Sequence, residues 1–246
     1  MIKIENVDVV GWEAAIRGAR NPMNSWWKGD SKQVPGMLED EQTYIPAHFE
    51  IGPNDKDLMR RLCKAGTDHR KFMRMITVYV DITAPLYWWK EFDTYKVGTV
   101  ANSCSTMHKI HAKEFTMDDF SHEHLLDCSA DHQLYLSAMI TDDDPAVYED
   151  PTEMWSFGPL DILEVTIKGL NRYRDLYLQT KNKVYWWQMI QLLPSSYNQK
   201  RTVMLNYEVL ANMYESRKNH KLDEWRELCE WCKTLPYSEL ITGENL

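Results

Sequence analysis

Residues 72–85 read FMRMITVYVDITAP, and this stretch decides the fold. The apolar residues Val78, Val80 and Ile82 alternate with polar or amphipathic ones. A two-residue period of this kind is typical of a strand with one buried face. Ala84-Pro85 follows directly, and because proline fits the first turn of a helix, the pair predicts that an aromatic-rich helix begins here.

Helical patterns lie on both sides of this strand. Upstream, Asn54 is a suitable N-cap for a helix that Gly66 ends. Downstream, apolar residues three or four apart predict a long helix from Pro159 onward. The other predicted elements are a strand at 2–4 and helices at 12–20, 185–193, 202–217 and 222–234. The pattern predicts the α+β class with a helical C-terminal half.

We expect one domain over 1–246, because a chain of 246 residues that is 43% hydrophobic can bury a single core. Two segments interrupt its periodicity. Residues 21–54 carry several prolines and glycines, which predicts an irregular loop. Residues 103–158 are rich in His and Asp and include Asp142-Asp143-Asp144-Pro145, which predicts a polar surface insertion.

The composition excludes several classes of protein. A net charge of −9 argues against non-specific nucleic-acid binding, which depends on neutralising phosphates. No apolar stretch is long enough to cross a bilayer, and the first residues lack the order of a signal peptide. Five irregularly spaced cysteines favour reduced thiols. We therefore expect a cytoplasmic protein that binds neither membrane nor nucleic acid.

Two clusters allow either a chemical or a structural interpretation. His108-x-x-His111 and His122-x-His124, with His132 nearby, contain metal-ligand residue types, but a solvated polar insertion explains them equally and no complete metal signature is present. Cys229-x-x-Cys232 has redox-motif spacing, but it also belongs to a helical apolar stripe. We predict no metal site and buried thiols.

Two blocks of the sequence resemble the flavin-dependent thymidylate synthases, which methylate the uracil ring of dUMP. The first block consists of Leu62-Cys63-Lys64-Ala65-Gly66, His69, Phe72, the strand to Ile82, Ala84-Pro85, Asn102 and Ser105. The second, closer block consists of Leu193-Pro194, Lys200-Arg201, Asn206, Leu210, Asn212 and Arg217.

The resemblance implies a mixed β-sheet flanked by helices, a homotetramer with active sites built from several subunits, and bound FAD. It also implies methylene-tetrahydrofolate and NADPH as co-substrates and dUMP or a related pyrimidine nucleotide as substrate. The implied catalytic residues are Ser105 and Arg217. The implied cofactor-binding residues are His69, Lys96, Asn102, Asn206 and Asn212. The implied substrate-binding residues are Glu91, Ser103, Ser105, Lys200, Arg201 and Arg217.

The chain departs from the family signature, which is Arg-His-Arg, seven residues and then Ser. Here the first three positions read Thr94-Tyr95-Lys96, so one cation of two remains. Without a gap the Ser position falls on Cys104, and with one inserted residue it falls on Ser105, which we prefer. Glu91 stands where the family has Gln, and its carboxylate would repel phosphate.

Two readings of function therefore stay open. The first is an FAD-dependent methyltransferase of pyrimidine nucleotides. The second is a non-catalytic nucleotide- or flavin-binding protein derived from the same family. Lys200, Arg201 and Arg217 likewise have two interpretations, as a phosphate-binding cluster or as cations paired with Glu208, Glu215 or Asp223.

Overall fold

The computed structural model describes residues 2–38, 44–127, 134–135 and 156–246. These residues form two compact units. The first contains 1–84, 88–103 and 200–246, and the second contains 85–87 and 104–199. Much of the predicted polar insertion at 103–158 lies outside the described residues, including His132 and Asp142-Asp143-Asp144-Pro145.

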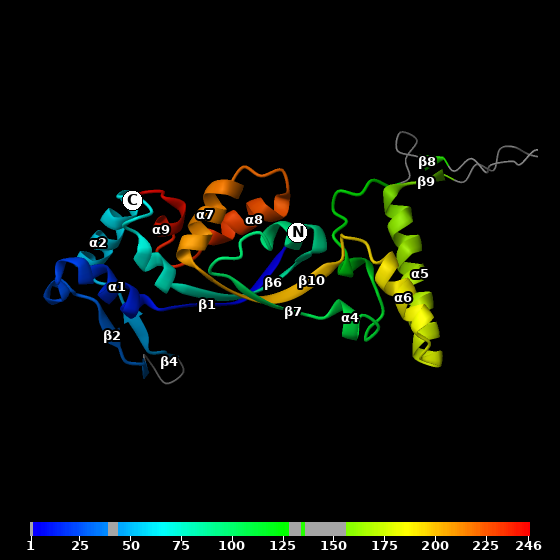
Figure 1. Cartoon of the computed structure of the whole chain (residues 1–246), viewed down its shortest axis with the longest axis horizontal. Helices are drawn as coiled ribbons and strands as arrows, with labels where there is room; N and C mark the ends of the chain where they lie inside the picture. The colour runs from blue at the N-terminus through cyan, green and yellow to red at the C-terminus, as the bar shows by residue number, and fades with distance from the viewer. Residues whose placement is uncertain (1, 39–43, 128–133, 136–155) are drawn as a thin grey trace, which may run out of the picture. The chain divides into compact units, whose positions relative to one another are not determined.

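A four-stranded sheet in the order β1-β6-β10-β7 is the centre of the first unit (Figure 1). Its strands are β1 (Lys3–Val10), β6 (Thr77–Pro85), β7 (Val100–Ser103) and β10 (Asn198–Asn206). The β1–β6 and β10–β7 pairs are antiparallel. Tyr207 N donates to Ile76 O, and Leu86 N donates to Tyr197 O, so β6 and β10 also run antiparallel.

One face of this sheet is buried, as the alternation predicts. Val78, Val80 and Ile82 are at most 1% exposed, whereas Tyr79 on the other face is 43% exposed. The covering helices are α3 (Leu86–Phe92), α7 (Tyr207–Arg217) and α8 (Asp223–Cys232) (Figure 1). Trp88 of α3 and Trp225 of α8 pack with ring centroids 4.8 Å apart. These large aromatic side chains of α3 and α8 therefore belong to the core of the first unit.

Further helices of the first unit are α1 (Trp12–Arg20), α2 (Pro53–Lys64), η3 (Lys71–Met75) and α9 (Glu239–Thr242). The predicted irregular loop at 21–54 holds short elements: η1 (Asn21–Met23), η2 (Trp26–Lys28), β2 (Lys32–Val34), β3 (Met37–Leu38), β4 (Tyr44–Ile45) and β5 (His48–Glu50). β2 pairs with β5 and β3 pairs with β4, both antiparallel.

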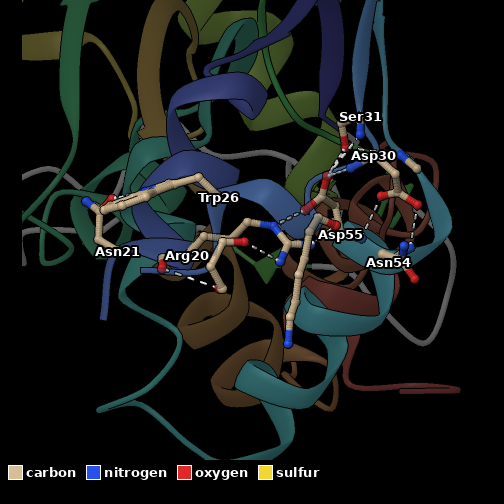
Figure 2. Close-up of polar contacts among 10 residues, drawn as sticks. Arg20, Asn21, Trp26, Asp30, Ser31, Asn54 and Asp55 are labelled. Atoms are coloured by element: carbon tan, nitrogen blue, oxygen red, sulfur yellow. Dashed lines mark hydrogen bonds and ion pairs between the residues drawn. The ribbon is translucent and has the colours of Figure 1, made fainter. Parts of the chain in front are cut away.

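A buried ion pair between Arg20 and Asp55 anchors the start of this loop (Figure 2). Arg20 Nε donates to Asp55 Oδ1 at 2.6 Å, and the side chains are 6% and 1% exposed. The other two guanidinium nitrogens donate to the carbonyls of Ser25 and Lys28. The Arg20 side chain therefore fixes the backbone of residues 25–28 at two carbonyl groups.

The second carboxylate oxygen of Asp55 also has hydrogen-bond donors. Asp55 Oδ2 accepts hydrogen bonds from the amides of Asp30 and Ser31 and from the Ser31 hydroxyl. Burial opposes ionisation of Asp55, but the hydrogen bonds from Ser31, Arg20 and the backbone outweigh it and lower its pKa.

The cap of α2 differs from the prediction. The N-cap position is Gly52 rather than Asn54, and Asp30 accepts hydrogen bonds from the amides of Asn54 and Asp55. Gly52 suits this place, since a Cβ there would lie 2.3 Å from the Asp30 carboxyl carbon. The cap is supplied from across the loop, a contact that no local pattern encodes.

The second unit is mainly helical. Its elements are α4 (Thr106–Lys109), η4 (Met117–Asp119), β8 (Leu134–Tyr135), β9 (Ser156–Phe157), α5 (Pro159–Thr180) and α6 (Lys183–Leu192). α5 and α6 pack against each other. The core contains Ile110, Phe115, Phe120, Leu163, Ile167, Leu170 and Met189. Asn171 bonds to both the amide and the carbonyl of Phe115, which ties α5 to the preceding loop.

The α+β class with a helix-flanked sheet is confirmed. The predicted helix at 202–217 is corrected: its first part is β10, so Lys200 and Arg201 lie on a strand. Pairing with β6 and β7 explains the difference, because it stabilises an extended backbone that sequence spacing alone does not specify.

None of the described helices has the length and apolarity needed to cross a membrane. The described residues contain no group of three or more His, Cys, Asp or Glu able to hold a metal ion. Cys229 and Cys232 are buried, as their helical stripe predicts.

Candidate functional site

Arg217, at the end of α7, lies in a cluster of polar and aromatic side chains that contains a second predicted residue, Glu91. Its guanidinium lies 4.6 Å from the ring centroid of Trp225 and 5.7 Å from that of Tyr95. Arg217 Nε donates to the Tyr95 hydroxyl at 3.0 Å. Its side chain is 20% exposed, so one part faces the aromatic core and another part is accessible.

Glu91, on α3, completes this cluster. Its Oε2 accepts hydrogen bonds from Arg217 Nη1 at 2.9 Å and from Trp225 Nε1 at 2.8 Å. His220 Nε2 lies 3.5 Å from the same oxygen. Two predicted substrate-binding residues that are 126 positions apart, Glu91 and Arg217, are thus in direct contact.

The other two cations of the predicted phosphate cluster lie on β10 and are also paired. Arg201 Nη1 is 2.8 Å from Asp93, and its guanidinium is 4.2 Å from the Trp89 ring centroid. Lys200 Nζ is 3.1 Å from Asp81 and 3.5 Å from Glu5. Lys200, Arg201 and Arg217 therefore all have carboxylate partners, though different ones from Glu208, Glu215 and Asp223.

The Lys200–Asp81 pair is charged on both sides. A hydrogen bond from Thr202, followed by those from Asn6 and Lys200, lowers the pKa of Asp81 to about 2. The hydrogen bond to Asp81 in turn raises the pKa of Lys200. This pair lies on the face of the sheet opposite Val78, Val80 and Ile82, since alternate residues of a strand face opposite sides.

Three predicted residues lie in the turn between α3 and β7 or on β7 itself, which is an edge strand of the sheet. Lys96 is exposed there and makes no ion pair with the described residues. Asn102 and Ser103 follow on β7, directly opposite Thr202 and Arg201. An exposed cation such as Lys96 is suited to an anionic ligand.

Asn206, the last residue of β10, packs against Gly98 in the turn between α3 and β7. Its side-chain oxygen caps α7 by accepting a hydrogen bond from Val209 N at 3.0 Å. Gly98 has φ of +81°, and a Cβ there would lie 2.7 Å from Asn206 Nδ2. The predicted cofactor role of Asn206 therefore coexists with a structural one.

His69 lines a cavity of about 590 Å³ in the first unit. Leu58, Leu62, Phe72 and Met75 give it apolar walls, and Lys71 adds a cation. The next residue, Arg70, binds Glu208 and donates to Asn212 Oδ1 at 3.3 Å. The predicted cofactor residues His69 and Asn212 thus lie on either side of Arg70.

This cavity fits the chemistry of a flavin. Its apolar walls suit an aromatic ring system, and its few polar groups are those that orient a ligand. Lys71 supplies positive charge for a diphosphate, and the carboxylate of Asp68 in the same lining partly offsets that charge. His69 and Lys71 are the lining residues that would hold FAD there, whereas Asn212 is not part of the lining.

Ser105 belongs to the second unit. Its hydroxyl caps α4 by accepting a hydrogen bond from His108 N at 3.0 Å. The neighbouring Cys104 is exposed, and its carbonyl accepts a hydrogen bond from Gln199.

Sequence reasoning missed the partners of the predicted cations. Tyr95 and Trp225 hold Arg217, Asp93 holds Arg201, and Arg70 links α7 to η3. The one local signal was Tyr95, which stands within the altered signature at 94–96. The remaining contacts join residues far apart in the chain.

No protein-family model matches the chain, and no curated protein matches it in sequence. Solved structures do match. Thymidylate synthase X (ThyX) from Helicobacter pylori, crystallised with FAD and dUMP, is 14% identical with a TM-score of 0.58, over 100% of this chain and 98% of that one. A second structure of the Helicobacter pylori enzyme with FAD and dUMP is 15% identical with a TM-score of 0.56, over 98% and 99%.

The UMP/dUMP methylase PolB from Streptomyces cacaoi, bound with 5-bromo-dUMP, is 15% identical with a TM-score of 0.51, over 99% of this chain and 95% of that one. At such identities the likeness establishes the fold. The described part of the chain has the fold of these enzymes.

Proposed function

We propose that this protein is a flavin-dependent methyltransferase that acts on dUMP or a related pyrimidine nucleotide. The observation that carries the proposal is Arg217, held against Trp225 and Tyr95 and in contact with Glu91, on a fold whose solved examples bind FAD and pyrimidine nucleotides. The proposal includes methylene-tetrahydrofolate as carbon donor, NADPH as reductant and a homotetrameric assembly.

The residues have distinct proposed roles. Bound FAD would supply the hydride chemistry that reduces the transferred one-carbon unit to a methyl group. Arg217 binds the nucleotide, and Ser103 offers it a polar group on β7, whereas Lys96 and Asn102 contact the cofactor. His69 and Asn212 hold the flavin.

Flavin binding and uracil activation provide the direct test. Protein purified or reconstituted with FAD should show flavin absorption. With FAD, NADPH and methylene-tetrahydrofolate, it should release tritium from dUMP labelled at carbon 5, because the methyl group replaces that hydrogen. A colourless protein that cannot be reconstituted with FAD would eliminate the proposal.

Arg217→Ala should weaken nucleotide affinity by at least tenfold, since it removes a charged partner. Titration calorimetry with dUMP measures this, and circular dichroism checks the fold. A folded variant with unchanged affinity would remove Arg217 from the site.

A test of Ser105 in catalysis needs a control variant, because the Ser105 side chain also caps α4. Ser105→Ala removes both the hydroxyl and the cap of α4, whereas Ser105→Asn keeps a cap acceptor. If Ser105 acts in catalysis, both variants should lose turnover. Recovery of turnover in the Asn variant would assign Ser105 a structural role alone.

The second candidate is a non-catalytic protein that binds a nucleotide or a flavin. It is favoured by the carboxylate partners of Lys200, Arg201 and Arg217, and by Thr94-Tyr95-Lys96 in place of Arg-His-Arg. Flavin absorption and nucleotide binding without tritium release would support this alternative.

A further inference from the structure

Glu91 presents its carboxylate to Arg217 in the manner of a bound anion. Its Oε2 alone meets Arg217 Nη1, Trp225 Nε1 and, at 3.5 Å, His220 Nε2. Convergent nitrogen groups of this kind are also what a phosphate oxygen of a ligand needs. The carboxylate of Glu91 thus occupies nitrogen groups of Arg217 and Trp225 that could otherwise bind an anionic ligand.

The Glu91–Arg217 pair is about as accessible to solvent as the other two pairs. The side chains of Arg217 and Glu91 are 20% and 38% exposed, those of Arg201 and Asp93 are 15% and 53% exposed, and those of Lys200 and Asp81 are 39% and 14% exposed. An incoming anion can therefore reach Arg217. To bind there it must replace the carboxylate of Glu91, which also accepts the hydrogen bond from Trp225 Nε1.

The pair also changes what the site can attract. A phosphate near Arg217 would meet one positive charge and, 2.9 Å from that charge, one negative charge. Attraction by the first and repulsion by the second nearly cancel. A phosphate gains from Arg217 only after the carboxylate has moved away, whereas an uncharged nucleoside does not face this competition.

We propose that Glu91 is a specificity-determining residue, an internal competitor whose carboxylate occupies Arg217 and weakens the binding of monophosphates relative to uncharged nucleosides. The identity of the natural ligand rests on the proposed function, but competition between Glu91 and an anion does not. Glu91→Gln keeps an acceptor for Trp225 Nε1 and removes the charge.

The test measures the affinities of inorganic phosphate, dUMP and deoxyuridine for the full chain by calorimetry. Glu91→Gln should raise affinity for phosphate and dUMP at least tenfold and leave that for deoxyuridine unchanged. Glu91→Ala removes the same charge without an amide and should raise phosphate affinity in the same direction. Thermal unfolding verifies that each variant is folded.

Glu215→Gln is the matched control, because it removes one negative charge from the same helix as Arg217. Glu215 pairs with Lys218 and is 72% exposed, so its loss should change phosphate affinity by less than about threefold. An equal rise in Glu215→Gln and Glu91→Gln would mean that net charge alone is responsible and would overturn the proposal.

The outcomes separate this proposal from the proposed function. Unchanged phosphate affinity in both folded Glu91 variants overturns the competitor role, even if the wild type binds FAD and methylates dUMP. Higher phosphate affinity in Glu91→Gln, with no binding of FAD by any variant, supports the competitor role while the methyltransferase proposal fails.

Discussion

Arg20 and Arg17 show how differently two arginines on one helix contribute to stability. Arg20 is buried and donates to Asp55, Ser25 and Lys28, whereas the Arg17 side chain is 67% exposed and 3.9 Å from Glu13. Arg20→Ala should cost about 3–5 kcal/mol of unfolding free energy, because it leaves Asp55 buried without its cation. Arg17→Ala should cost less than about 0.5 kcal/mol. Urea unfolding of both variants compares the two losses directly, and equal losses would contradict a stabilising role for the buried Arg20–Asp55 ion pair.

Asp55 should also make stability depend on pH. Its pKa is lowered in the folded protein, so it contributes stability above its unfolded pKa, which is near 4. That contribution is lost as the pH falls below about 4 towards the folded-state pKa. The stability difference between wild type and Asp55→Asn should therefore be constant above about pH 5 and shrink below pH 4. A difference that stays constant down to pH 2.5 would show that ionisation of Asp55 is unimportant.

At the scale of the element, the turn after α3 depends on Gly98. Gly98 and Gly66 both have positive φ, +81° and +99°, but a Cβ at Gly66 meets nothing within 4 Å. Gly66→Ala should cost about 1 kcal/mol from backbone strain alone. Gly98→Ala should cost about 2 kcal/mol, since the new methyl group also displaces Asn206 from its cap on α7. Thermal unfolding measures both losses, and Asn206→Ala should recover part of the excess at Gly98.

Elements with a clear local period could be predicted from the sequence, and those defined by distant partners could not. The alternation in β6 and the start of α5 were visible in spacing alone. β10 was not, because its extended backbone is stabilised by neighbours about 100 residues away. The candidate site follows the same rule: the importance of Arg217 came from a family resemblance, while its contacts with Glu91 and Trp225 required the tertiary structure.

At the scale of the whole molecule, thiol reactivity should report on burial. Burial raises the pKa of Cys63 to about 12 and that of Cys229 to about 11, and it also raises the pKa of Cys232. Cys104 is exposed. Among the four cysteines that the structure describes, a thiol reagent at pH 8 should react rapidly only with Cys104 of the native protein, and Cys104→Ser should remove the label that mass spectrometry finds at that position. Rapid modification of Cys229 or Cys232, detected by mass spectrometry, would instead favour a redox role.

The three hydrogen-bonded partners of the Arg20 guanidinium also constrain the length of the segment that follows it. One rigid guanidinium reaches the carbonyls of Ser25 and Lys28 while its Nε is bound to Asp55. The number of residues between these carbonyls is thereby fixed, because an inserted residue would move one of them out of reach. Between positions 20 and 28, insertions and deletions should be tolerated less well than most substitutions, although this segment reads as an ordinary loop.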